Sequence, residues 1–332
     1  MPDLPVSYET EHLDVHIGPN RFLCAGSVID YERHVQYVAD QLGIDVQRRV
    51  PVYAIKDIED YCSNPDAAAC TSRDGVVFAT PWTAYHELAH GVACEIRTGA
   101  PSILAEGLAV SFEPSINESL SDPREFSEVH SSDFGPFYSR AGHFTRWLAE
   151  QLGPEEFAAL YRTATYDEGV WSAMESAYGA SLATDYASQS PAMWIQHRQC
   201  ADMLLLEARA EGGWVFEAKF DCEDEATLGP YEKTNQNEAN GSTDMYQSFL
   251  IDMPEPGTYR LERSEGLVIW YERCLAENPA TEQEALDERV RQPVFFTLVD
   301  DYSIVDFEHS GVWRVDVLHE PVDVWLTIVP EP

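Results

Sequence analysis

Apolar residues follow two different periods along the first 200 residues of this chain. Compact apolar runs predict strands at 14–17, 22–24, 50–55 and 75–80. Apolar residues that recur every three or four positions predict helices at 28–42, 82–97, 102–112, 138–152, 154–165, 170–178, 181–186 and 192–208. The polar stretch between them, at 114–136, predicts a long loop. This order of elements predicts an α+β domain with a small mixed sheet and a helical subdomain.

The pattern changes beyond about residue 210, where short apolar runs are separated by Gly, Pro and Asn. These runs predict strands at 214–220, 247–251, 257–261, 268–271, 294–298, 313–318 and 322–329. The acidic, polar stretch 221–243 predicts a loop. Many short strands with turns between them are typical of an antiparallel β-sandwich. The sequence therefore predicts an α+β domain over residues 1–199 and an all-β, sandwich-like domain over residues 200–332.

The net charge of the chain limits the kinds of molecule that we expect it to bind. Lys and Arg number 21 and Asp and Glu number 58, which gives a formal net charge of −37 over 332 residues. A surface this acidic repels phosphate groups and anionic lipid, so we expect neither a nucleic acid nor a membrane surface as the partner. No run of 18 apolar residues occurs, so we expect no transmembrane segment. The pattern predicts no particular oligomeric state.

The chain has seven cysteines, and an odd number requires at least one free thiol. Cys62 and Cys70 flank a short polar loop, which favours a local disulfide between them. Cys222 and Cys274 lie in strand-like sequence and are candidates for a second bridge. Cys94 lies on an apolar predicted helix and is the candidate for the free thiol.

Disulfide-like spacing and strong acidity favour an oxidising compartment, which means a secreted, periplasmic or cell-surface protein. The first nine residues are polar and contain no apolar signal core, which leaves a cytoplasmic location open.

The segment HELAH at positions 86–90 carries the most specific chemical signal. Residues four apart on a helix lie within about 40° of each other around the axis, so His86 and His90 can bind one metal ion. Glu87 lies about 60° from His90 and can reach a water beside that ion without binding the ion itself. A third ligand is available in Glu106, because the break at Gly99 lets the next predicted helix fold back over the first. The sequence therefore predicts a Zn²⁺ cofactor held by two imidazoles and one carboxylate.

HELAH at 86–90 followed by EGLA at 106–109 resembles the gluzincin metallopeptidases, and specifically the peptidase MA-like family. The segment YSRAGHF at 138–144 is similar to a later helix of that family, which commonly carries Tyr, then Ala-Gly, a small residue and Phe. His143 stands where the family usually has serine. The resemblance covers residues 10–195 and implies that residues 1–199 form a zincin-like metallopeptidase domain.

The resemblance also implies roles for individual residues. It implies that the two motif histidines and Glu106 bind zinc, and that Glu87 activates a water and later protonates the leaving amine. It implies that Tyr138 donates a hydrogen bond to the oxyanion. It further implies that the strand at 75–80 is an edge strand that binds extended substrate by backbone pairing.

These observations favour a zinc-dependent peptidase that hydrolyses peptide bonds in a peptide or protein substrate, with Glu87 as general base. A zinc hydrolase that cleaves a non-peptide amide would need the same residues. The alternative from a different class is a non-catalytic secreted binding or surface protein, in which the first domain is a scaffold and the β-domain recognises the partner. The aromatic residues of the β-domain are expected to lie mainly in its core: Trp214, Tyr231, Tyr246, Trp270 and Trp313.

Overall fold

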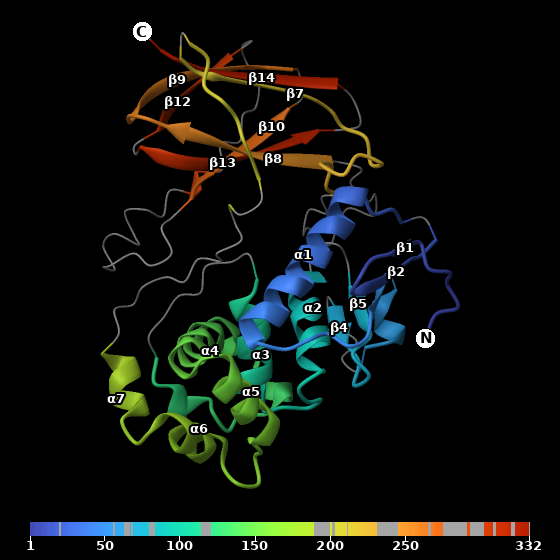
Figure 1. Ribbon diagram of the computed structural model, residues 1–332, viewed down its shortest axis with the longest axis vertical. Coiled ribbons are helices and arrows are strands. Elements are labelled where there is room, and N and C mark those ends of the chain that lie inside the picture. Colours follow the sequence, from blue (N-terminus) through green and yellow to red (C-terminus); the bar gives the residue numbers. More distant parts are fainter. Residues whose placement is uncertain are drawn as a thin grey trace. The chain divides into compact units, whose positions relative to one another are not determined.

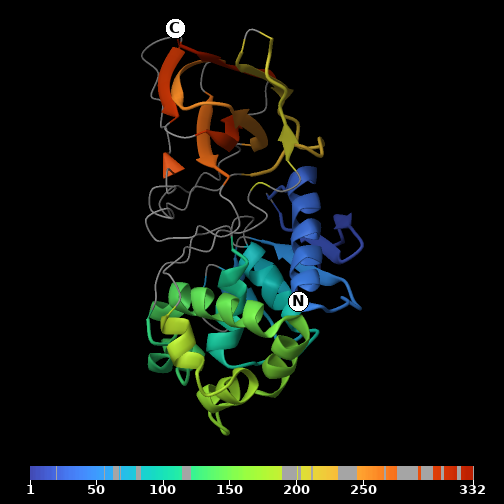
Figure 2. The ribbon, with the colours of Figure 1, turned by 60° about the vertical axis from the view of Figure 1, so that its left-hand side comes forward.

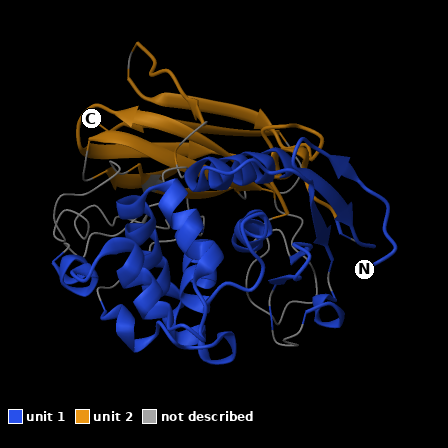
Figure 3. Cartoon of the chain, turned by 60° about the horizontal axis from the view of Figure 1, so that its bottom comes forward, with its two compact units in different colours: residues 1–21, 28–196, 278–285 blue, residues 22–27, 197–277, 286–332 orange. Residues whose placement is uncertain are grey.

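The structure of this protein is a computed structural model in which the chain forms two compact units. It describes residues 1–19, 21–55, 57–62, 67, 69–79, 84–113, 121–188, 200, 203–210, 212–230, 245–264, 267–274, 291–292, 302–307, 310–319 and 323–331. The first unit comprises residues 1–21, 28–196 and 278–285, and the second comprises residues 22–27, 197–277 and 286–332 (Figure 3). The first is a mixed α/β region and the second consists of β-sheets, which confirms the coarse fold prediction.

A five-stranded sheet in the first unit has the strand order β1-β2-β3-β5-β4 (Figure 1). Its strands are β1 (Tyr8–Glu9), β2 (Leu13–Ile17), β3 (Val50–Ala54), β5 (Val77–Ala79) and β4 (Ala69–Thr71). β2, β3 and β5 are parallel, whereas β1 and β4 run antiparallel at the two edges of the described sheet. The expectation that the strand at 75–80 forms an edge is therefore wrong, because β4 pairs beside it. β4 has three residues, all half-buried, so no apolar pattern indicated it.

The helices of the first unit follow the predicted segments closely. They are α1 (Ala25–Leu42), α2 (Ala84–Ala93), α3 (Ser102–Ser111), α4 (Tyr138–Leu152), α5 (Pro154–Thr163), α6 (Val170–Tyr178) and α7 (Leu182–Ala187). α3 packs against both α2 and α4, and α4 to α7 gather into a helical subdomain (Figure 2). In the predicted loop 114–136, the described residues contain short 3-10 turns: η3 (Pro123–Glu125), η4 (Ser131–Asp133) and η5 (Gly135–Phe137).

Glycine and proline set the helix ends, as the sequence predicted. Gly43 follows α1 with a φ of +60°, a conformation that glycine adopts without steric cost. Gly153 follows α4 with a φ of +78°, and Pro154 begins α5 at the position where a missing N–H costs no helical hydrogen bond. α1 buries its apolar stripe, which consists of Val28, Tyr31, Val35, Val38 and Leu42.

The second unit contains two sheets, with the strand orders β11-β10-β13-β8-β6 and β12-β9-β14-β7. The strands are β6 (Leu204–Leu205), β7 (Trp214–Lys219), β8 (Met245–Met253), β9 (Gly257–Arg263), β10 (Val268–Arg273), β11 (Arg291–Gln292), β12 (Tyr302–Phe307), β13 (Gly311–His319) and β14 (Asp323–Pro330). Among the described strands of this unit, the pairings are antiparallel except that of β6 with β8. One buried cluster draws side chains from both sheets, so the sheets pack face to face.

The aromatic residues of this unit divide between core and surface. Trp214 and Trp313 are 2% and 0% exposed, as expected for core residues, and Tyr246 and Trp270 are half-buried. Tyr231 lies outside the described residues. Three large apolar side chains remain exposed on the outer face of the sheet that contains β9: Tyr302, Ile304 and Trp325.

Several predicted elements differ from the structure. Residues 22–24 form no strand and lead directly into α1. The predicted helix 192–208 lies largely outside the described residues, and its part at 204–205 is the strand β6, because pairing with β8 satisfies the backbone there. The predicted strand 294–298 also lies outside the described residues. β12 was not predicted.

The disulfides correct the predicted pairing. The bridge between Cys62 and Cys70 is confirmed, but Cys222 does not pair with Cys274. Cys24 pairs with Cys222 across 198 residues, and Cys200 pairs with Cys274. Cys94 is free, as expected, and lies in the turn just after α2.

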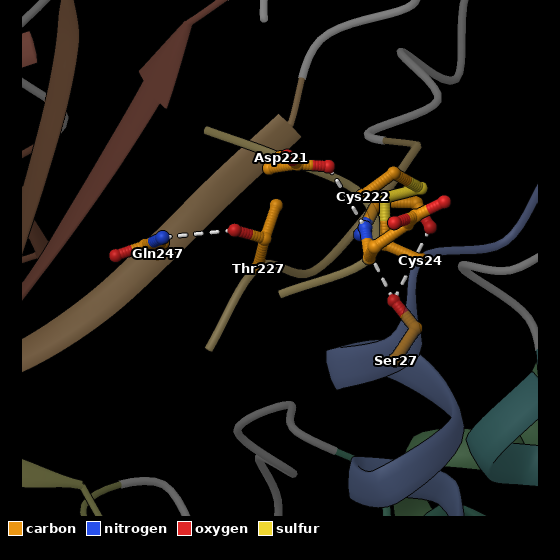
Figure 4. Close-up of a disulfide and its surroundings, with 8 residues drawn as sticks. Cys24, Ser27, Asp221, Cys222, Thr227 and Gln247 are labelled. Atoms are coloured by element: carbon orange, nitrogen blue, oxygen red, sulfur yellow. Dashed lines mark hydrogen bonds between the residues drawn. A yellow bond between two sulfur atoms is a disulfide. The ribbon is translucent and has the colours of Figure 1, made fainter. Parts of the chain in front are cut away.

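Backbone hydrogen bonds surround the Cys24–Cys222 bridge at the start of α1 (Figure 4). The amide of Ala25 donates to the carbonyl oxygen of Cys222 at 2.9 Å, and the amide of Gly229 donates to Ser27 Oγ at 2.9 Å. Three disulfides indicate that the chain folds in an oxidising environment. Among the described residues, every helix is too short or too polar to cross a bilayer.

Candidate metal centre

α2 lies directly on the sheet, and this fixes the position of the HELAH segment. The buried face of the helix includes Leu88, Ala89 and Val92. A Cβ atom at Gly91 would lie only 2.9 Å from Val50 Cγ1, so the absence of a side chain there allows the close approach.

α3 folds back beside α2 after a turn at Gly99, which has a φ of +70°. α3 also lies very close to α4, because a Cβ atom at Gly107 would lie 2.7 Å from the carbonyl oxygen of Ala141. Thr145 Oγ1 donates to the carbonyl oxygen of Ile103 at 2.7 Å and ties the same two helices together. Glu106, which precedes Gly107, is thereby presented to the histidines of α2.

The structure brings His86, His90 and Glu106 together. The two Nε2 atoms of the histidines lie 3.1 Å apart, and each lies 3.3 Å from Glu106 Oε2. Two donor atoms that are each about 2.0–2.1 Å from a tetrahedral zinc ion are about 3.3 Å from each other. The three atoms therefore have the spacing of three corners of a zinc coordination tetrahedron, and the donor set fits the ion.

Glu113 orients one of these histidines. Glu113 Oε1 lies 2.5 Å from His86 Nδ1, so Nδ1 donates its hydrogen to Glu113. The other ring nitrogen, Nε2, then faces His90 Nε2 and Glu106 Oε2. The sequence analysis did not identify Glu113. It stands seven residues after Glu106 but beyond the last residue of α3, Ser111, so helical spacing gave no signal for it.

The site carries an excess of negative charge. Burial lowers the pKa of His86, but hydrogen bonds with Glu106 and Glu113 outweigh it and raise that pKa to about 10. Burial raises the pKa of Glu106, but hydrogen bonds with His86 and His90 outweigh it and hold that pKa well below its usual range. Both pKa shifts come from the same contacts: the carboxylates favour a positively charged imidazole, and the imidazoles favour an ionised carboxylate.

Glu87 is 7% exposed and does not belong to the triangle of donor atoms. Thr71, on β4, donates its hydroxyl hydrogen to Glu87 Oε2 at 2.7 Å or to the Glu87 main-chain oxygen at 2.9 Å. The Glu87 carboxylate interacts electrostatically with both His86 and Tyr138. Glu87 is therefore near enough for its charge to act on two residues of the site. No sequence signal pointed to Thr71.

Tyr138, the first residue of α4, lies at the same site. Its ring centre is 5.9 Å from that of His86, and its hydroxyl is hydrogen-bonded to Glu106. Burial raises the pKa of Tyr138, and the nearby Glu106 carboxylate raises it further, so the hydroxyl keeps its proton. His143, further along α4, is not among the three donor residues, and its Nδ1 bonds to the buried hydroxyl of Tyr186 at 2.7 Å.

A second group of side chains has the spacing to hold a metal ion, Glu11, His12 and Glu32, but it has a structural explanation. Both oxygens of Glu32 already have protein partners. Oε1 lies 2.5 Å from His12 Nδ1, and Oε2 accepts from the Thr10 hydroxyl at 2.5 Å. These bonds fasten α1 to the turn before β2, and a metal ion would have to displace them.

Comparisons of this chain with protein-family models, with curated proteins and with solved structures gave no match. The functional argument therefore depends on the geometry of the site.

Proposed function

We propose that this chain is a zinc-dependent peptidase of the gluzincin type, similar to the peptidase MA-like family. The observation that carries the proposal is the triangle of 3.1–3.3 Å between His86 Nε2, His90 Nε2 and Glu106 Oε2, with Glu87 next to His86 in the sequence. A helix-borne HExxH pair with a carboxylate from the next helix is the donor set of this class of hydrolase. The mixed sheet and helical subdomain are consistent with a zincin-like domain.

The residues of the site have separate roles in this proposal. His86, His90 and Glu106 would hold the zinc ion, which would supply Lewis acidity toward a water and toward the carbonyl oxygen of the substrate. Glu87 takes the proton of the attacking water and passes it to the leaving amine nitrogen. Tyr138 keeps its proton and donates a hydrogen bond to the oxygen that becomes negative.

β4 supports a peptide as the substrate. It is the edge strand on the side of the sheet that carries α2, and its outer backbone groups pair with no other described strand. An extended peptide could add to this edge by main-chain hydrogen bonds. The expected substrate-binding strand is therefore β4 and not the strand at 75–80, which lies inside the sheet.

The test compares the wild type with Glu87→Gln after loading with zinc. We expect Glu87→Gln to retain zinc and to lose cleavage of casein and of a peptide library, because the amide cannot accept the proton. Glu106→Ala should lose zinc. Glu155→Gln, an exposed residue on α5, is the matched control and should behave as the wild type. Equal cleavage by the wild type and Glu87→Gln would refute the proposal.

A non-catalytic binding protein is the second candidate function. The observation that favours it is the exposed group of Tyr302, Ile304 and Trp325 on one sheet face of the second unit. This candidate predicts no cleavage by any variant. For either function, three disulfides and a net charge of −37 support a secreted, periplasmic or cell-surface location.

A further inference from the structure

Thr71 contacts the proposed general base, and the reaction outlined above does not use it. Its Oγ1 lies 2.7 Å from Glu87 Oε2 and 2.9 Å from the Glu87 main-chain oxygen. We propose that Thr71 is a positioning residue that holds the Glu87 carboxylate in place for proton transfer. This inference rests on the proposed peptidase function.

The pairing of β4 with β5 directs Thr71 toward α2. Thr71 pairs with Val77, and Cys70 pairs with Phe78. Residues paired across two strands face the same side of a sheet, and neighbours along one strand face opposite sides. Cys70 and Phe78 both belong to the apolar cluster on one face. Thr71 and Val77 therefore face the other side, where α2 lies.

Gly91 brings the helix within reach of this short side chain. A Cβ atom at Gly91 would lie 2.9 Å from Val50 Cγ1 and 3.5 Å from Val77 Cγ2, so α2 approaches the sheet closely there. Glu87 stands four residues before Gly91 and therefore lies on the same face of the helix. A larger residue at 91 would move Glu87 away from Thr71.

The Thr71 hydroxyl can hold Glu87 throughout the reaction. A threonine hydroxyl has one hydrogen to donate and two lone pairs to accept. While Glu87 is a carboxylate, Thr71 donates to Oε2. The other carboxylate oxygen of Glu87, Oε1, then takes the proton from water and passes it to the leaving amine, so proton transfer does not break the bond with Thr71. Serine preserves both bonds, whereas valine has the same shape as threonine and preserves neither.

The experiment measures zinc content, kcat and KM of the full-length Thr71→Val and Thr71→Ser variants with a quenched peptide library. For Thr71→Val we expect zinc content and KM as in the wild type and a kcat that is about 10–100-fold lower, the size of effect seen when an outer hydrogen-bond partner is removed at a metal site. For Thr71→Ser we expect a kcat close to that of the wild type. A wild-type kcat in Thr71→Val would overturn the proposal. A serine variant as slow as the valine variant would also overturn it, because packing and not the hydroxyl would then matter.

Crystal structures of both variants separate this proposal from the proposed function. If the wild type cleaves nothing, the peptidase assignment fails, and the position of the Glu87 carboxylate still tests Thr71. A carboxylate that turns away in Thr71→Val and stays in place in Thr71→Ser supports positioning. The same carboxylate position in both variants overturns it.

Discussion

Gly107→Ala tests whether the contact between α3 and α4 sets the geometry of the metal centre. The added Cβ would lie 2.7 Å from the carbonyl oxygen of Ala141 and even closer to Thr145 Oγ1. The carbonyl belongs to the backbone of α4 and cannot rotate away. α3 must therefore shift by about 0.7 Å to reach an ordinary van der Waals separation. Glu106 precedes Gly107 and must move with the helix.

The expected effect on stability is modest, and the expected effect on metal binding is larger. Overpacking of a tight contact costs about 1–3 kcal/mol, and replacing glycine by alanine inside a helix returns about 1 kcal/mol. Metal sites tolerate deviations of about 0.2 Å in their distances. A shift of Glu106 Oε2 several times larger should weaken zinc binding by about 10–100-fold.

The assay is competition for zinc with a chelator, together with urea unfolding. Ala105→Gly is the matched control, because it lies on the same helix, costs about 1 kcal/mol in helix propensity and adds no atom. We expect Gly107→Ala to lose zinc at chelator concentrations that leave the wild type and Ala105→Gly loaded. If Gly107→Ala binds zinc as tightly as the control, the separation of α3 and α4 does not determine the position of Glu106.

Three further predictions follow from other contacts. Glu113→Gln should weaken zinc binding by about 10–100-fold in the same competition, because His86 loses a charged partner; wild-type affinity would exclude this role for Glu113. Burial raises the pKa of Glu32, but hydrogen bonds with Thr10 and His12 outweigh burial and leave that pKa lowered in the folded chain. The ionised carboxylate therefore stabilises the fold at any pH above the pKa of an unfolded glutamate. This stabilisation is lost as the pH falls through the lower pKa of the folded state. Urea unfolding of Glu32→Gln should therefore show a deficit at pH 7 that shrinks at pH 3, and an equal deficit at both would contradict the linkage. Gly26→Ala places a Cβ 2.5 Å from the carbonyl oxygen of Thr227. Calorimetry should therefore show that the second unit is less stable by about 1–3 kcal/mol. An unchanged transition would show that the loop at Thr227 moves aside without cost.

The sequence predicted those parts of the molecule that repeat a local pattern. The helices were recognisable because an apolar stripe such as that of α1 recurs over 18 residues and ends at a glycine. His86, Glu87 and His90 were recognisable because one helical turn fixes their mutual positions. The placement of Glu106 beside them required the helix break at Gly99, which is also a local signal.

The features that the sequence did not predict depend on contacts between distant segments. The partner of Cys222 is Cys24, 198 residues away, and no spacing rule reaches that far. β4 consists of three half-buried residues, so only its pairing with β5 makes it a strand. Thr71 was missed for the same reason, because its contact with Glu87 exists only once that strand is paired.

The Cys24–Cys222 bridge closes residues 25–221 into one covalent ring, and the proposed metal centre lies within the ring. A peptidase that cuts its own chain, or is cut by another, at one bond inside this ring becomes two polypeptides that remain joined. The nicked molecule gains one water and stays in one piece until a thiol reagent opens the disulfides that join its two parts. During synthesis the ring cannot close until Cys222 has been made, so the helices that carry the donor residues are made long before they are enclosed.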